Sequence, residues 1–244
     1  VGPARLVGEV IILEGKVCTI QVYEETTGLK PGEEVEGFGA PISVTLAPGI
    51  LNNIFDGIER PLKSIAEEAG NFIKRGMNVS SLDTKKLWDT TIKVEKGQHI
   101  KGGTIIAEVP ETTAITHKVM LPPNMSGYVL DVVENGSYTI SDRLLTLQLE
   151  DGSEKEISMT QHWPIRNARP VLKRFSATRP LITGQRILDT FFPLAKGGTA
   201  AVPGGFGTGK TMTQHQIAKW SDADIIVYIL SLIHISEPTR QAEI

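Results

Sequence analysis

The stretch GGFGTGKT, residues 204–211, fits the pattern G-x-x-x-x-G-K-[ST] of a phosphate-binding loop. Glycines let the backbone turn so that successive N–H groups converge on one anion at the start of a helix. Lys210 and Thr211 are the predicted catalytic residues: Lys210 would reach the terminal phosphates, and the Thr211 hydroxyl would hold Mg²⁺. The residues predicted to bind the nucleotide are Gly204, Gly205, Phe206, Gly207, Thr208, Gly209, Lys210 and Thr211.

The residues on either side of this loop predict the strand, helix and strand that such a loop requires. Residues 199–202 form a short run of small and apolar residues, suited to a buried strand. Residues 211–220 contain no Gly or Pro and have a moderate apolar face, which predicts a helix. The β-branched run at 224–229 predicts a buried parallel strand. This context favours a nucleotide site over a glycine-rich surface loop with an incidental lysine.

The composition of the chain argues against several functional classes. A net charge of −3, a pI near 6.0 and an aromatic content of 6% do not favour nucleic-acid binding. No apolar run approaches the length of a membrane span. The one cysteine, Cys18, is predicted to be a buried thiol, which favours a reducing, cytoplasmic compartment.

The amino-terminal segment reads as short strands separated by turns, which predicts a small β-barrel or sandwich over residues 1–46. The chain begins at Val1 rather than Met, and few strands precede the first turn. We therefore expect this barrel to be incomplete. A helix is predicted over residues 62–75, after a turn-rich connector.

Residues 91–149 contain a weak internal repeat, which predicts a pseudo-symmetric all-β module. The strings VEKG (94–97) and VENG (133–136) are each predicted to lie in a hairpin followed by an apolar run. The module resembles the sandwich of biotinyl and lipoyl carrier domains. Lys118 is the nearest candidate for modification, but the carrier motifs Glu-Ala-Met-Lys-Met and Asp-Lys-Ala do not occur. A carrier or binding module is thus the less favoured alternative.

Other polar residues do not suggest a second catalytic site. His162 and His215 each lack a partner at metal-ligand spacing, and we interpret both as packed or capping residues. A GTPase-like switch is not favoured, since the guanine signature Asn-Lys-x-Asp does not occur.

Longer strings resemble the catalytic A subunit of V/A-type rotary ATPases, and the similarity runs from Val1 to Ile229. The strings are QVYEETTGL (21–29), FDGIERPL (55–62), LITGQR (181–186), DTFFP (189–193), KGGTAAVPG (196–204) and TQHQIAKWSDA (213–223). The resemblance implies a multidomain fold: a truncated β-barrel at 1–46, a β-rich insertion at 76–156 and the start of a P-loop α/β nucleotide-binding domain. That last domain would be discontinuous, at 47–75 and 157–229.

The resemblance also implies a function. Three A and three B subunits would alternate in an A3B3 ring, with a central rotor and a peripheral stalk. ATP or ADP with Mg²⁺ would bind at the ring, and the complex would couple ATP hydrolysis or synthesis to proton or sodium transport by a separate membrane sector. The protein would be cytoplasmic and peripheral to the membrane. A non-catalytic nucleotide-binding subunit of a related rotary ATPase is the alternative, although non-catalytic B subunits lack the insertion and an intact P-loop.

The carboxy-terminal residues 230–244 depart from the family pattern. Catalytic members continue with Gly-Cys-Gly-Glu, in which the Glu positions the attacking water. Here the segment LSLIHISEPTRQAEI resembles an in-frame translation of a sequencing adapter, with a divergent natural loop as the alternative. We therefore expect the chain to be an amino-terminal fragment that does not hydrolyse ATP by itself.

Overall fold

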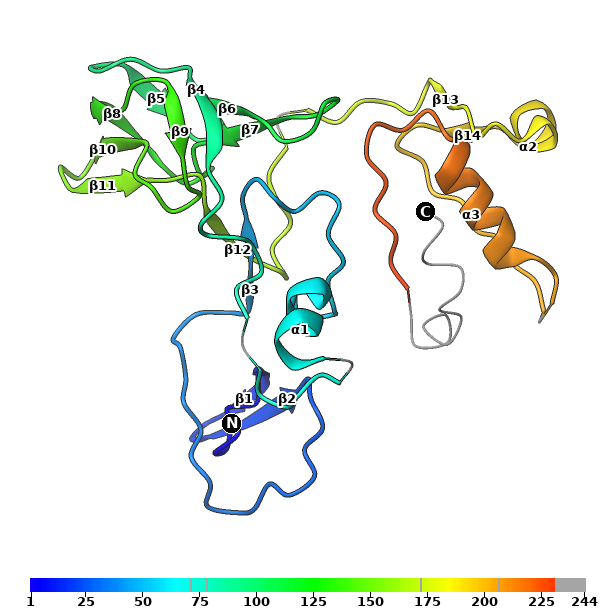
Figure 1. The fold of residues 1–244 in the computed structure, drawn as a ribbon, viewed down its shortest axis with the longest axis horizontal. Helices are drawn as coiled ribbons and strands as arrows, with labels where there is room; N and C mark the ends of the chain where they lie inside the picture. The colour runs from blue at the N-terminus through cyan, green and yellow to red at the C-terminus, as the bar shows by residue number, and fades with distance from the viewer. Residues whose placement is uncertain (71, 78, 172, 206, 231–244) are drawn as a thin grey trace. The chain divides into compact units, whose positions relative to one another are not determined.

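The computed structural model describes residues 1–70, 72–77, 79–171, 173–205 and 207–230, and it divides into two units (Figure 1). The first unit is Val1–Pro170 and the second is Val171–Ile244. The predicted loop residue Phe206 and residues 231–244 of the departing segment lie outside the described residues.

The amino-terminal segment forms one antiparallel hairpin, made of β1 (Gly8–Glu14) and β2 (Val17–Val22). Gly15 makes the turn with φ +59°, a left-handed conformation that glycine adopts without steric cost. The sequence predicted an incomplete barrel over residues 1–46. The described strands in this segment indeed do not close into a barrel. Cys18 is exposed, so the prediction of a buried thiol is wrong. Leu13 and Val17 beside it are also exposed, because no described layer covers this hairpin.

A second strand pair joins segments that are far apart in the sequence. β3 (Ser43–Leu46) pairs antiparallel with β12 (Gln161–Pro164), on the far side of the insertion. Helix α1 (Leu62–Ala69) follows β3 and buries Ile65. The predicted helix over 62–75 was too long, because the chain leaves the helix at Gly70, where φ is +76°.

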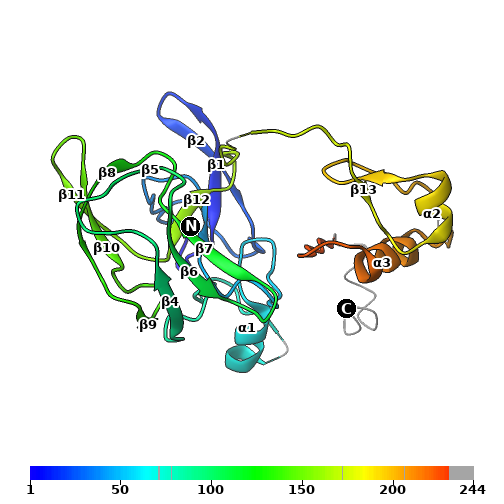
Figure 2. The same cartoon turned by 90° about the horizontal axis from the view of Figure 1, so that it is seen from above.

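The insertion between β3 and β12 contains two four-stranded sheets, in the orders β7-β6-β4-β9 and β11-β10-β8-β5 (Figure 2). The strands are β4 (Trp88–Ile92), β5 (His99–Lys101), β6 (Ile105–Pro110), β7 (Thr116–Met120), β8 (Ser126–Val132), β9 (Gly136–Tyr138), β10 (Leu145–Leu149) and β11 (Glu154–Ile157). β4–β7 and β8–β11 are two copies of one unit, and each copy gives its second strand to the sheet of the other. The predicted repeat is therefore present in the topology.

The strand exchange corrects one detail of the prediction. The segments 94–97 and 133–136 were expected to lie in hairpins. Instead, 94–97 connects β4 to β5 and 133–136 leads from β8 into β9, so each joins strands of different sheets. The sheets share a core in which Ile106, Val109 and Leu147 are at most 1% exposed. Burying each of these side chains stabilises the module by about 1.5–3 kcal/mol relative to exposure.

The second unit has little regular structure within its described residues. β13 (Pro180–Leu181) pairs with β14 (Leu194–Ala195), and α2 (Arg186–Phe191) lies between them. Helix α3 (Lys210–Trp220) occupies the predicted helical segment. The predicted strands at 199–202 and 224–229 are wrong, since neither segment forms a strand, and Ile229 is 88% exposed. A strand needs at least one neighbour to pair its backbone N–H and C=O groups, and the described residues of this unit supply none for these runs.

Candidate phosphate-binding site

The backbone of the predicted phosphate-binding loop turns at two glycines. Gly207 has φ +75°, and Gly209, the N-cap of α3, has φ +80° and ψ 16°. A residue with a side chain would cost about 1–2 kcal/mol in this left-handed conformation. A Cβ at Gly204 would lie 2.4 Å from Thr208 Oγ1, so the Thr208 side chain would have to move to admit one. Of the two glycines that the pattern requires, Gly209 is therefore favoured by its backbone conformation and Gly204 by the space available.

The start of α3 provides backbone donors. Thr213 N donates to Gly209 O at 2.9 Å, so the N–H groups that precede it have no partner within the helix. These N–H groups and the positive end of the helix dipole favour an anion at this position. The amino end of α3 therefore has the backbone donors that an anion site requires.

Lys210 lies over the loop that precedes it. Its ammonium donates to the carbonyl of Gly204 at 2.6 Å, and its side chain is partly buried. Within the described residues Lys210 makes no ion pair. A phosphate in the loop would thus meet a positive charge that no carboxylate neutralises. The sequence could not foretell this carbonyl contact, because the loop conformation determines which oxygen lies within reach.

The hydroxyls of three threonines in and after the loop differ in their hydrogen bonding. Thr208 Oγ1 donates to Gly205 O at 2.8 Å, and Thr213 Oγ1 donates to Gly209 O at 3.1 Å. Both hydroxyls therefore hold the backbone. The Thr211 hydroxyl makes no hydrogen bond to another described residue, which leaves it available as a ligand.

The residues present fit the way in which Mg²⁺ binds beside a nucleotide. Mg²⁺ keeps several waters and binds through few protein groups together with substrate phosphates. The described residues contain no group of three or more His, Cys, Asp or Glu side chains that could hold a metal ion alone. Thr211 would supply the protein oxygen, and the phosphates would supply the remaining negative charge.

The far end of α3 is fixed to the β13–β14 pair. The Asp222 carboxylate accepts a hydrogen bond from Ile182 N at 3.0 Å. It also forms an ion pair with the Lys196 ammonium, at 2.7 Å. The Lys196 ammonium lowers the pKa of the Asp222 carboxyl. Gly184 lies so close to Trp220 that an added Cβ would be 3.0 Å from the Trp220 Cβ. These contacts hold the helix that carries the loop.

Asp189 is a further residue of structural importance that motif reasoning did not single out. Its carboxylate accepts hydrogen bonds from Thr183 N at 2.9 Å, Thr183 Oγ1 at 2.7 Å and Gly184 N at 3.1 Å. These bonds lower the pKa of Asp189. The signal in the sequence is the spacing Thr183–Asp189 across a turn, which fits a carboxylate that satisfies backbone donors.

Family models for three domains match this chain. The "ATP synthase alpha/beta family, beta-barrel domain" matches residues 2–39, and the "ATPsynthase alpha/beta subunit barrel-sandwich domain" matches residues 79–166. The "ATP synthase alpha/beta family, nucleotide-binding domain" matches residues 184–239, which include the predicted phosphate-binding loop at 204–211.

Relatives match over 229 residues, 94% of this chain. The V-type ATP synthase alpha chain of Halothermothrix orenii is 56% identical, and the A subunit of the A-type ATP synthase of Methanopyrus kandleri is 53% identical. The V-type ATP synthase alpha chain 2 of Clostridium tetani is 55% identical. The chain belongs to the V/A-type ATP synthase A-subunit family. It spans 38–39% of the length of these relatives.

Family membership confirms the predicted fold class: a β-barrel segment, a barrel-sandwich insertion and the start of a nucleotide-binding domain. The other residues considered in the sequence, Lys118, His162 and His215, are not part of the loop at 204–211. Lys118 is on strand β7 rather than in the tight turn that carrier domains use. His162 is exposed on β12, and His215 contacts the ring of Tyr228, with centroids 5.1 Å apart. Among the described residues, no helix is long and apolar enough to cross a membrane.

Proposed function

We propose that this chain forms the amino-terminal part of the catalytic A subunit of a rotary V/A-type ATP synthase. In this role residues 204–211 bind the phosphates of ATP or ADP, and the complete protein couples ATP hydrolysis or synthesis to proton or sodium transport. The observation that carries the proposal is the Lys210 ammonium, held over a glycine loop at the start of α3 without a carboxylate partner among the described residues.

Each part of the loop has one role in the proposed mechanism. The loop N–H groups bind the phosphate oxygens, and Lys210 exchanges the Gly204 carbonyl for the terminal phosphates. There its charge stabilises the negative charge that develops during phosphoryl transfer. Mg²⁺, when bound, would neutralise part of the phosphate charge. The Thr211 hydroxyl would hold it.

The proposed partners follow from the family. We propose that three copies of the complete protein alternate with three B subunits in an A3B3 ring around a central rotor, beside a peripheral stalk, at the cytoplasmic face of the membrane. The relatives are named as A subunits or alpha chains, which supports the catalytic assignment over a non-catalytic one. We further propose domain limits of 1–46, 47–75, 76–156 and 157–229.

We also propose that residues 230–244 are foreign to the family sequence. The relatives align over 229 residues, whereas the nucleotide-binding family match ends at residue 239. A continuous genomic read across this junction tests the proposal. Genomic DNA that encodes this same segment would show it to be a natural, divergent loop.

The catalytic assignment is tested in the complete protein, assembled with its partner subunits. Lys210→Ala should lower Mg-ATP turnover at least about a hundredfold, since removing one preorganised charge donor commonly costs this much. Lys219→Ala is the matched control, because it removes the same charge from the exposed end of the same helix. Near-normal turnover of Lys210→Ala would refute the role of Lys210.

A further inference from the structure

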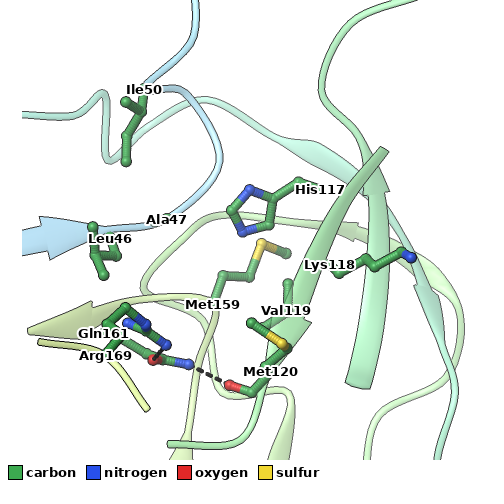
Figure 3. Close-up of a pocket in the computed structure, with 10 residues that line it drawn as sticks. All are labelled: Leu46, Ala47, Ile50, His117, Lys118, Val119, Met120, Met159, Gln161 and Arg169. Atoms are coloured by element: carbon green, nitrogen blue, oxygen red, sulfur yellow. Dashed lines mark hydrogen bonds between the residues drawn. The ribbon is translucent and has the colours of Figure 1, made fainter. Parts of the chain in front are cut away.

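A cavity of about 220 Å³ lies between β3, β7 and β12 in the first unit (Figure 3). The apolar residues that line it are Leu46, Ala47, Ile50, Val119, Met120 and Met159. None of these residues belongs to the phosphate-binding loop.

One end of the cavity carries a guanidinium group in a fixed position. Arg169 Nη2 donates to Gln161 Oε1 at 3.2 Å, and Arg169 Cζ lies 4.6 Å from the centre of the Trp163 ring. Gln161 is itself fixed, because its amide nitrogen donates to the carbonyl of Met120. Figure 3 shows Arg169 and Gln161 together at this end. The stacking and the hydrogen bonds orient the guanidinium before any ligand binds.

The charge of Arg169 is not balanced within the described part of the chain. Arg169 makes this one hydrogen bond and no ion pair there. A guanidinium has five N–H donors, so most of them remain available. A partly buried arginine with free donors is suited to a planar anion such as a carboxylate.

The other ionisable groups around the cavity do not supply a competing anion. Glu111 accepts hydrogen bonds from Gly49 N at 2.7 Å and Leu51 N at 3.2 Å, and its second oxygen lies 3.3 Å from His117 Nδ1. Its carboxylate thus already has three polar partners. Burial lowers the pKa of His117, which favours the neutral ring at neutral pH. The Lys118 side chain points away from the cavity (Figure 3).

We propose that this cavity binds a small organic carboxylate with a short aliphatic tail. Arg169 would receive the carboxylate through two parallel N–H···O hydrogen bonds. The tail would lie against Ile50, Val119 and Met159, which exclude water from it. Such a ligand would bridge β7 of the insertion and the β3–β12 pair, so it would stabilise their contact.

The test uses octanoate as the probe and the full 244-residue chain. Octanoate is titrated while the fluorescence of the tryptophans is followed, since Trp163 lies under Arg169. We expect saturable binding, about tenfold weaker in Arg169→Gln and unchanged within about twofold in Arg143→Gln. Arg143 is a matched control because it lies outside the cavity, paired with Asp131 at 3.0 Å.

Two further measurements separate binding in the cavity from other effects. Ile50→Phe fills the apolar wall and keeps Arg169, so it should also weaken octanoate binding about tenfold. Octylamine, which has a similar tail and the opposite charge, should not bind saturably. Equal affinity in wild type, Arg169→Gln and Ile50→Phe would overturn the proposal, as would no octanoate binding to wild type at about 10 mM. Saturable octylamine binding would overturn the carboxylate specificity.

Discussion

Replacing Lys210 by alanine should weaken Mg-ATP binding to the complete protein about 2- to 30-fold. In the free protein the ammonium makes one hydrogen bond, to the neutral carbonyl of Gly204 at 2.6 Å. Such a bond contributes about 1 kcal/mol net, whereas bonds to charged groups contribute about 1.5–3 kcal/mol. Exchanging the carbonyl for phosphate oxygens therefore favours binding by about 0.5–2 kcal/mol after discounting the lost contact. Each 1.4 kcal/mol corresponds to about a tenfold change in affinity.

Isothermal titration of the complete protein, assembled with its partner subunits, with Mg-ATP measures this change. Lys219→Ala controls for net charge, because Lys219 lies on the same helix with its ammonium 5.7 Å from the centre of the Trp220 ring. We expect the affinity of Lys219→Ala to stay within about twofold of wild type. If both variants lost affinity equally, general electrostatic attraction would explain binding. If neither lost affinity, the phosphates would not lie beside Lys210.

Three further outcomes are expected. Thr211→Ala should abolish the Mg²⁺ dependence of ATP binding, measured as the ratio of affinities with Mg²⁺ and with EDTA; an unchanged ratio would contradict the role of its hydroxyl. Gly127→Ala should lower the free energy of unfolding by at least about 1–3 kcal/mol, since its Cβ would lie 2.0 Å from Gln148 O, whereas Gly57→Ala, with open space around it, should not. Arg166, and then Tyr23, lower the pKa of Glu9 from 4.5 to about 2. The charged form therefore stabilises the fold above pH 4.5, and this is lost as the pH falls towards 2. The stability difference between wild type and Glu9→Gln should shrink over that window, and a constant difference would refute the assignment.

The glycine turn before α3 and the helix itself could be predicted because their conformation is determined locally. Glycines at 207 and 209 adopt left-handed backbone angles, and the segment after Gly209 contains no helix breaker. Helix α3 begins at Lys210 and ends at Trp220, close to the predicted span. The partner of the Lys210 ammonium could not be predicted, because it depends on the path of the loop in space.

The sequence of the segments on either side of the loop does not by itself determine whether those segments form strands. Residues 224–229 have the β-branched composition of a buried strand, yet Val227 is 78% exposed. Composition reports what a segment can form, whereas a sheet also requires partner strands to satisfy its N–H and C=O groups. In the described part of the second unit, no apolar side chain is buried.

The insertion illustrates the opposite case, in which the partners lie within the same segment. Its repeat was visible in the strings at 94–97 and 133–136, but the exchange of β5 and β9 between the sheets was not. Each copy of the repeat leaves its own sheet one strand short, so neither sheet is complete without the other copy. Leu144, Leu145 and Leu147 of the second copy share one core with Ile106 and Val109 of the first. Because this exchange makes the two copies interdependent, the insertion should unfold as one cooperative unit, with the amides of β6 and β10 exchanging hydrogen at the same rate once global unfolding limits exchange. Faster exchange of one copy alone would show that the repeats are independent.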